Sequence, residues 1–128
     1  MIFFDLDVTP FFKIVNLAYY PLLLLLLLPK IQTSWIYFIG LIGIVFGIKL
    51  LVKRKRPDGK DTLSFPSGHS AAAWFVVPLY SWNPLVLLWA LLVSISRVVL
   101  RRHYITDVLA GGLLGAIFGI YTHRHPSL

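Results

Sequence analysis

The feature that most constrains this chain is its set of long apolar stretches. Residues 11–28, which include seven consecutive leucines at 22–28, and residues 35–52 and 104–121 are each apolar over about the length needed to cross a bilayer. The sequence of 128 residues is 58% hydrophobic and 13% charged, whereas about a quarter of the residues in a soluble domain are charged. We therefore predict an all-α integral membrane protein, with residues 1–128 forming one helical bundle.

Turn signals divide the chain into five predicted transmembrane spans. These spans are residues 11–28, 35–52, 67–80, 84–100 and 104–121. Residues 1–10 are predicted to be a short interfacial segment, 30–34 a polar turn and 53–65 a polar loop. Asn83 and Pro84 are predicted to be the N-cap and the first position of the fourth span. The third span is short and only moderately apolar, so we expect it to be surrounded by protein rather than by lipid.

Two of the predicted spans carry glycines at helical spacing. They are Gly40, Gly43 and Gly47 in the second span, and Gly111, Gly115 and Gly119 in the fifth. Small residues three or four positions apart let membrane helices approach closely. We therefore predict that both glycine faces pack against another helix.

The charge balance indicates an anionic partner. The net charge is +7, which in a membrane protein favours lipid headgroups or a phosphate-bearing substrate over nucleic acid. There is no cysteine, so a disulfide framework and a thiolate metal site are excluded. The N-terminus lacks a basic region before an apolar core and a small-residue cleavage site, so a removable signal peptide is not predicted.

Counting membrane crossings brings three polar clusters to one face. The second span ends in the polar loop 53–65 and the third span begins from it. The third span crosses away and the fourth returns, so the end of the fourth and the start of the fifth reach the same face as the loop. Residues far apart in the sequence are therefore predicted to meet there.

The first cluster contains Lys49 and Arg56. These residues are seven apart, about two helical turns, so they share a face if the helix continues to Arg56. The alternative is a lysine that extends its amine to the membrane surface, followed by a basic loop that sets topology.

The second cluster is the helix start at Pro66, Ser67, Gly68 and His69. The first N–H groups of a helix have no internal partner and form a ready site for phosphate oxygens. Gly68 would let the backbone approach such a ligand closely. The alternative is an ordinary helix start with a solvated histidine.

The third cluster contains Arg97, His103 and Asp107. If the chain is helical from Tyr104 onward, His103 and Asp107 lie four residues apart on one face. A carboxylate so placed can hold one imidazole nitrogen and leave the other free to act. The alternative is an arginine that extends to the surface beside a surface His–Asp pair.

The remaining charged side chains are interpreted as surface groups. Arg101 and Arg102 are predicted to face headgroups. His123 and His125 form an H-x-H pattern that could bind a metal, but we interpret them as a solvated tail. Taken together, the three clusters supply fixed positive charge, N–H donors and two histidines on one face, which indicates chemistry on a phosphoryl group.

The three clusters resemble the three-part signature of the type 2 phosphatidic acid phosphatase superfamily. The matching segments are Lys49-x6-Arg56-Pro57, Pro66-Ser67-Gly68-His69 and Ser96-Arg97-x5-His103-x3-Asp107. All eleven fixed positions agree and they occur in the same order. The resemblance covers residues 49–107, and the flanking spans fit the helical bundle of that family.

The resemblance implies a role for each signature residue. His103 attacks phosphorus and forms a phosphohistidine, Asp107 orients His103, and His69 protonates the leaving oxygen. The phosphate is held by Lys49, Arg56, Ser67, Gly68 and Arg97. Neither a metal nor another cofactor is expected, because cations and a helix start meet the charge of the phosphate.

The chain departs from the family in two respects. Membrane members commonly have six spans, and we count five, so the N-terminal part is reduced. The loop between the first two signature segments is also short, with eight residues at 58–65, which leaves little room for a large headgroup-binding cap.

The predicted function is hydrolysis of a lipid-linked phosphate monoester or pyrophosphate. Phosphatidic acid, phosphatidylglycerol phosphate, a polyprenyl (pyro)phosphate and lipid A phosphate are all open as substrates, and the oligomeric state is unknown. The alternatives are a lipid phosphotransferase using the same phosphohistidine, a vanadate-dependent haloperoxidase, which the apolar spans argue against, and a non-catalytic lipid-binding bundle.

The predicted location is a bacterial inner membrane, crossed several times. Outside the signature, seven basic residues lie on the predicted site face (Lys13, Lys53, Arg54, Lys55, Lys60, Arg101, Arg102) and two on the other (Lys30, Arg124). The positive-inside rule would place the site in the cytoplasm, whereas bacterial relatives mostly place it outside. An enzyme for anionic lipids has cations at its site on either side, so the sidedness stays open.

Overall fold

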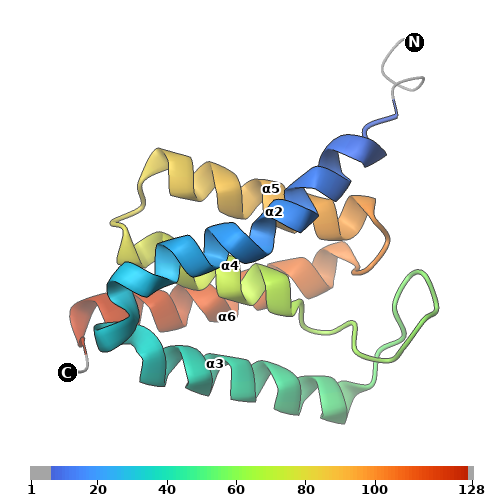
Figure 1. Cartoon of the computed structure of the whole chain (residues 1–128). Helices are drawn as coiled ribbons and strands as arrows, with labels where there is room; N and C mark the ends of the chain where they lie inside the picture. The colour runs from blue at the N-terminus through green and yellow to red at the C-terminus, as the bar shows by residue number, and fades with distance from the viewer. Residues whose placement is uncertain (1–6, 127–128) are drawn as a thin grey trace.

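The computed structural model describes residues 7–126 and is all-helical over them, as predicted (Figure 1). The elements are α2 (Thr9–Leu27), the 3-10 helix η1 (Leu28–Lys30), α3 (Ile31–Val52), α4 (Gly68–Leu79), α5 (Pro84–Val99) and α6 (Ile105–Arg124). The predicted interfacial segment 1–10 lies mostly outside the described residues, and its last two residues already belong to α2.

Helix α4 occupies the centre of the bundle, as predicted for the third span. It packs against α2, α3, α5 and α6, and Figure 1 shows it between these helices. Nine of its 12 residues are buried, among them Ala71, Phe75 and Val76, which are all fully buried. Its small residues, which include three consecutive alanines at 71–73, let four neighbours approach one short helix, so α4 can be surrounded by protein.

The predicted close packing of the glycines in α6 is confirmed. A Cβ added at any of the three would overlap a backbone carbonyl oxygen of α4. The contacts are Gly111 with Ser67, Gly115 with Ala71, and Gly119 with Phe75. Backbone therefore lies against backbone along this pair of helices.

The prediction that the glycine face of α3 also packs against another helix of this chain is wrong for the described residues. A Cβ added at Gly40, Gly43 or Gly47 would have no atom within 4 Å among the described residues. Helix α3 lies at the edge of the bundle (Figure 1), and its outward face includes the large apolar residues Phe46 and Leu51. Glycine spacing alone does not say whether a neighbouring helix lies opposite.

The predicted polar turn at residues 30–34 is also wrong, because α3 begins at Ile31. Ser34 Oγ donates to the carbonyl of Lys30 at 2.7 Å, and Thr33 Oγ donates to the same carbonyl at 3.2 Å. Hydroxyl groups that bond back to an earlier carbonyl can remain inside a helix. The turn between α2 and α3 is therefore confined to η1.

The predicted starts of α4 and α5 are confirmed. Ser67 is the N-cap of α4, and its hydroxyl accepts from the Ser70 N–H at 3.2 Å. Asn83 is the N-cap of α5, and its side chain accepts from the Leu85 N–H at 2.9 Å. These caps satisfy N–H groups that the first turn of a helix leaves free.

Helix α3 does not continue to Arg56. It ends at Val52, and Lys53 takes a left-handed conformation with φ 54°. Lys49 and Arg56 therefore do not share a helix face, and Arg56 belongs to the loop that follows α3.

Two helical stretches are long and apolar enough to cross a membrane, residues Thr9–Val52, which include the turn at η1, and Ile105–Arg124. Helices α4 and α5 are shorter, with 12 and 16 residues. Large apolar side chains point outward from α2 and α3, including Leu17 at 71% and Leu51 at 84% exposure. Such surfaces are suited to a membrane protein, and the crossing of all five spans remains a prediction.

Candidate active site

The three polar clusters meet at one end of the bundle. The loop after α3 lies beside the α5–α6 connection (Figure 1), and the N–H of Asp58 donates to the carbonyl of Arg101 at 3.1 Å. The N–H of Ser67 donates to the carbonyl of Asp107 at 3.0 Å. The convergence predicted from counting crossings is confirmed.

A polar cavity of about 340 Å³ lies at this end of the bundle. Six predicted site residues line it: Lys49, Arg56, Gly68, His69, Arg97 and His103. Three further residues, Asn16, Tyr20 and Arg102, complete the lining. The predicted site is therefore a physical cavity with cations and two histidines on its wall.

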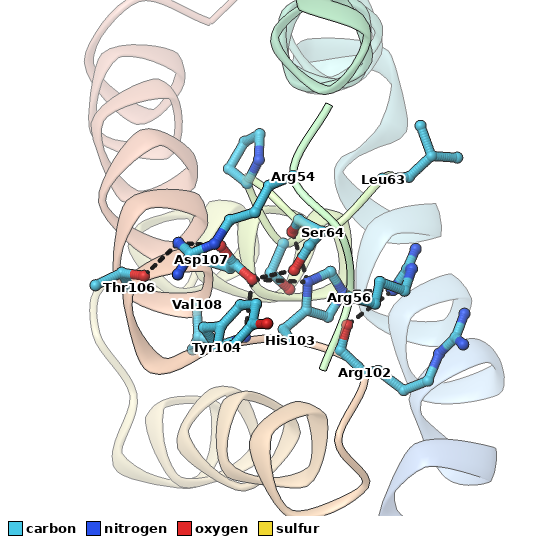
Figure 2. Close-up of polar contacts among 12 residues, drawn as sticks. Arg54, Arg56, Leu63, Ser64, Arg102, His103, Tyr104, Thr106, Asp107 and Val108 are labelled. Atoms are coloured by element: carbon cyan, nitrogen blue, oxygen red, sulfur yellow. Dashed lines mark hydrogen bonds and ion pairs between the residues drawn. The ribbon is translucent and has the colours of Figure 1, made fainter. Parts of the chain in front are cut away.

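Both ring nitrogens of His103 have a hydrogen-bond partner (Figure 2). Nδ1 lies 2.7 Å from the carbonyl oxygen of Ser64, and Nε2 lies 3.1 Å from Nη1 of Arg56. A carbonyl only accepts and a guanidinium only donates. The proton therefore sits on Nδ1, and the lone pair of Nε2 faces the arginine.

The charge state of His103 agrees with this tautomer. Its side chain is 2% exposed. Burial, together with the nearby guanidinium of Arg97, lowers the pKa of His103 to about 3. The imidazole is therefore neutral near pH 7, and its Nε2 carries the lone pair, which in this structure accepts from Arg56.

Asp107 is fully buried at the start of α6 and accepts several hydrogen bonds (Figure 2). Its carboxylate accepts from the Ser64 hydroxyl, from the Tyr104 N–H at 2.8 Å and from Arg54 Nη1 at 3.1 Å. Its nearest oxygen is 3.8 Å from Nδ1 of His103. The hydrogen bond predicted between this carboxylate and an imidazole nitrogen is therefore not formed in the structure: the Ser64 carbonyl takes Nδ1. Asp107 holds Ser64 and lies beside the ring.

His69 lies in the first turn of α4 and is held by aromatic rings. Its ring stacks on Tyr19 with centroids 4.2 Å apart, and it meets Tyr20 edge-on at 5.5 Å. Nε2 of His69 is buried and has no hydrogen-bond partner among the described residues. This nitrogen therefore remains available to a ligand in the cavity.

Two of the three predicted phosphate-binding cations, Lys49 and Arg56, have partners in the loop after α3. Lys49 Nζ donates to the carbonyls of Leu63 at 2.6 Å and Pro66 at 2.5 Å. Arg56 Nε donates to Asp61 at 2.6 Å. Lys49 therefore fixes the loop after α3 as well as supplying positive charge at the cavity.

The backbone start of α4 is placed as predicted, with one difference at Ser67. Gly68 lines the cavity, whereas the hydroxyl of Ser67 accepts from the Ser70 N–H within the helix cap. The side chain of Ser67 is therefore occupied in capping α4, and its contact with a phosphate remains a prediction.

Six residues of the site escaped the sequence analysis, two of which, Tyr19 and Tyr20, contact the ring of His69. Ser64 and Arg54 contact Asp107, and Asn16 lines the cavity from α2. Arg102 lines the cavity as well and pairs with Asp58 at 2.8 Å, although it was predicted to face headgroups. The one sequence signal for these residues is the count of membrane crossings. It places the start of α2, the loop after α3 and the α5–α6 connection at this end of the bundle.

Comparison with known proteins gives a family match. A sequence model of the PAP2 superfamily matches residues 31–127. A lipid A 1-phosphatase of Porphyromonas gingivalis is 36% identical over 90 residues, which cover 60% of this chain and 19% of the relative. A phosphatidylglycerophosphatase B of Bacillus subtilis is 35% identical over 91 residues, 55% of this chain and 45% of the relative.

A plant relative aligns over more of its length. A probable lipid phosphate phosphatase beta of Arabidopsis thaliana is 28% identical over 148 residues, 77% of this chain and 68% of the relative. In contrast, the chain spans less than half the length of the Porphyromonas gingivalis and Bacillus subtilis relatives. No solved structure gives a significant match.

Proposed function

Because the chain belongs to the PAP2 superfamily, we propose that it is an integral membrane phosphatase that hydrolyses a lipid phosphate monoester or pyrophosphate through a phosphohistidine. The observation that carries this proposal is the state of His103. Its side chain is buried, its Nδ1 donates to the Ser64 carbonyl, and its Nε2 lone pair faces Arg56 at a cavity lined by cations. The names of the relatives, which are lipid phosphatases, support the same conclusion.

The first chemical step forms the phosphohistidine. The lone pair of His103 Nε2 attacks phosphorus, and the bond from phosphorus to the leaving oxygen breaks. His69, when protonated, gives its proton to that oxygen, so the lipid leaves as an alcohol or as a lipid monophosphate. The carbonyl of Ser64 keeps the Nδ1 proton in place, and the carboxylate of Asp107 stabilises the positive charge that develops on the ring.

The second step releases phosphate. Neutral His69 takes a proton from water, the water oxygen attacks phosphorus, and the phosphorus–nitrogen bond breaks. His103 returns to its neutral form, and His69 is again protonated for the next cycle. One histidine therefore serves as nucleophile while the other serves as acid and then as base.

The phosphoryl oxygens are proposed to bind the cations at the cavity. Arg56, Lys49 and Arg97 lie at its wall, and the N–H groups at the start of α4 are additional donors. Charge that develops in the transition state is met by groups already in place. We therefore propose that activity needs no metal, so EDTA is expected to leave phosphate release unchanged.

The proposal is tested with purified protein in detergent micelles or liposomes. The substrates are phosphatidic acid, phosphatidylglycerol phosphate, undecaprenyl pyrophosphate and lipid A, with phosphate release as the readout. At least one should be hydrolysed by the wild-type chain and none by His103→Asn, which has a similar size. Equal release by both proteins, or by neither on any substrate, would contradict the proposed activity.

The proposed location is the bacterial inner membrane, which the five helices cross with the cavity at one face. The chain has no cysteine, so a single introduced one reports its side of the membrane. Lys60→Cys lies in the loop beside the cavity and Ser81→Cys in the α4–α5 turn, and both positions are exposed. A membrane-impermeant maleimide should label one of them in sealed vesicles and the other only after permeabilisation. Labelling of both from outside would contradict the crossing.

A further inference from the structure

Arg97 differs from the other arginines around the cavity in the charge of its partner. Arg54, Arg56 and Arg102 each form an ion pair with an aspartate. Arg97 is 6% exposed, and its Nη1 donates at 2.7 Å to the neutral side-chain amide of Asn16. Its positive charge is therefore not compensated by a bound carboxylate among the described residues.

The contact with Asn16 also determines which side of the guanidinium remains free. Arginine binds two phosphate oxygens through two adjacent N–H groups. Asn16 takes one N–H of Nη1, and the Nε–Nη2 edge makes no hydrogen bond to another described residue. Nε of Arg97 is buried and has no hydrogen-bond partner in the described part of the chain. The arginine thus has one end fixed and a donor edge without a partner.

The orientation of Asn16 follows from the chemistry of its partner. A guanidinium cannot accept a hydrogen bond, so the amide oxygen of Asn16 must face Arg97. Asn16 also lines the cavity. It belongs to α2, which precedes the segment matched by the family model, residues 31–127, so it lies outside the signature.

We propose that Asn16 is a positioning residue of the phosphate site. Its amide oxygen holds Arg97 at Nη1, so that the Nε–Nη2 edge is presented to two oxygens of the substrate phosphate. Because the amide is neutral, the full charge of the arginine remains for the phosphate. This role rests on the proposed function and assigns part of the site to α2.

Two nearly isosteric variants of Asn16 separate its effect on the position of Arg97 from its effect on the charge of Arg97. Asn16→Leu removes the acceptor and leaves Nη1 without its partner. Asn16→Asp keeps an acceptor but adds a carboxylate, which compensates Arg97 and repels a phosphate. Leu17→Ala is the matched control on the same helix, since Leu17 is 71% exposed and its side chain is not part of the cavity wall.

The probes are orthovanadate, measured as binding to the detergent-solubilised protein, and dioctanoyl phosphatidic acid, measured as KM and kcat. Asn16→Leu should weaken vanadate binding and raise KM by roughly tenfold, the effect of losing a hydrogen bond to a charged group. Asn16→Asp should weaken vanadate binding further and raise KM further. In each of the two variants, the fall in kcat should be smaller than the rise in KM. Leu17→Ala should behave as wild type. Wild-type vanadate affinity in Asn16→Asp would overturn the proposal.

A double-mutant cycle distinguishes positioning from a general loss of structure. In an Arg97→Leu background, Asn16→Leu should have no further effect on vanadate binding, because Asn16 acts through Arg97. An equally large effect with and without the arginine would overturn the proposal. If vanadate binds the wild type as expected but no lipid phosphate is hydrolysed, the proposed function fails while the cycle still tests Asn16.

Discussion

The two histidines of the cavity are held in different ways. His103 has a polar partner at each ring nitrogen, the Ser64 carbonyl and the Arg56 guanidinium. His69 is held by the faces and edges of Tyr19 and Tyr20, and its Nε2 has no partner among the described residues. One ring is fixed in rotation and tautomer, and the other is fixed in position with a nitrogen left free.

This difference matches what each proposed role requires. A nucleophile needs a defined tautomer, which the Ser64 carbonyl provides at Nδ1, and a lone pair at the phosphate site, where Nε2 faces Arg56. An acid–base group must gain and lose a proton in each cycle, and a permanent partner on the transferring nitrogen would oppose that. The contacts of the two rings therefore lead to separate expectations for each histidine.

Replacing His103 should have the largest effect. His103→Ala removes the atom that we propose bonds to phosphorus, so phosphate release should fall by about three orders of magnitude or more. The loss should be the same for a lipid phosphate and for p-nitrophenyl phosphate, because both need the nucleophile. Phosphate release assays with both substrates measure it. Near-normal turnover of either substrate would remove His103 from the mechanism.

Replacing His69 should have an effect that depends on the leaving group. General acid catalysis contributes about 10²–10⁴-fold, and His69→Ala should lose this with a lipid alkoxide. p-Nitrophenolate leaves without a proton, so its release rate in a single-turnover measurement should change far less. Equal losses with both leaving groups would contradict the proposed role of His69 as the general acid.

Replacing Asp107 should slow turnover without changing the leaving-group dependence. Asp107→Asn removes the negative charge that we propose stabilises the His103 imidazolium, and we expect kcat to fall about 100-fold. Ser64→Ala is the control, because it loses only the hydroxyl contact and keeps the carbonyl that binds Nδ1, so its loss should be about tenfold or less. The kcat values compare the two, and a larger loss in Ser64→Ala would contradict this order.

Replacing Tyr19 tests the aromatic support of His69. Tyr19→Leu removes the stacked ring, and an aromatic pair is worth about 0.5–1.5 kcal/mol, so lipid phosphate turnover should fall a few-fold. Tyr19→Phe keeps the ring and should retain nearly full turnover. Equal losses in both variants would indicate that the hydroxyl, and not the stacking, matters.

The smallest effect is a pH dependence of stability. His103 has a pKa lowered to about 3 by burial and by Arg97, whereas an unfolded chain has a histidine pKa of about 6.5. Between these values only the unfolded state binds the proton, so stability falls as the pH decreases from 6.5 toward 3. The melting temperature in detergent should therefore drop more between pH 7 and pH 4.5 in wild type than in His103→Asn. An identical drop would contradict a neutral, buried His103.

Much of the arrangement could be predicted because it depends on chain direction. Counting crossings places Lys49, His69, Arg97, His103 and Asp107 at one face without any knowledge of side-chain contacts. The central position of α4 followed from its short length and its alanines. These features depend on properties of single segments, which a sequence displays directly.

The errors and omissions concern contacts between segments. The glycines of α3 are three and four residues apart and those of α6 are four apart, but no other described helix lies within contact of the α3 glycines. Ser64 and Asn16 reach the site from a loop and from a separate helix, and neither has a spacing that marks it. Arg56 reaches the site although α3 ends before it, because Lys53 turns the chain.

The glycine contacts between α6 and α4 have a consequence for how far these helices can slide. The contacts repeat every four residues, and each glycine lies against one carbonyl of the partner helix. A shift by a fraction of a turn would press the neighbouring side chains of α6 onto those carbonyls. The next position free of such overlap lies one repeat away, about 6 Å along the axis at 1.5 Å per residue. His69 and Asp107 stand near the starts of the two helices, so the glycine contacts oppose small longitudinal displacements of one side chain relative to the other.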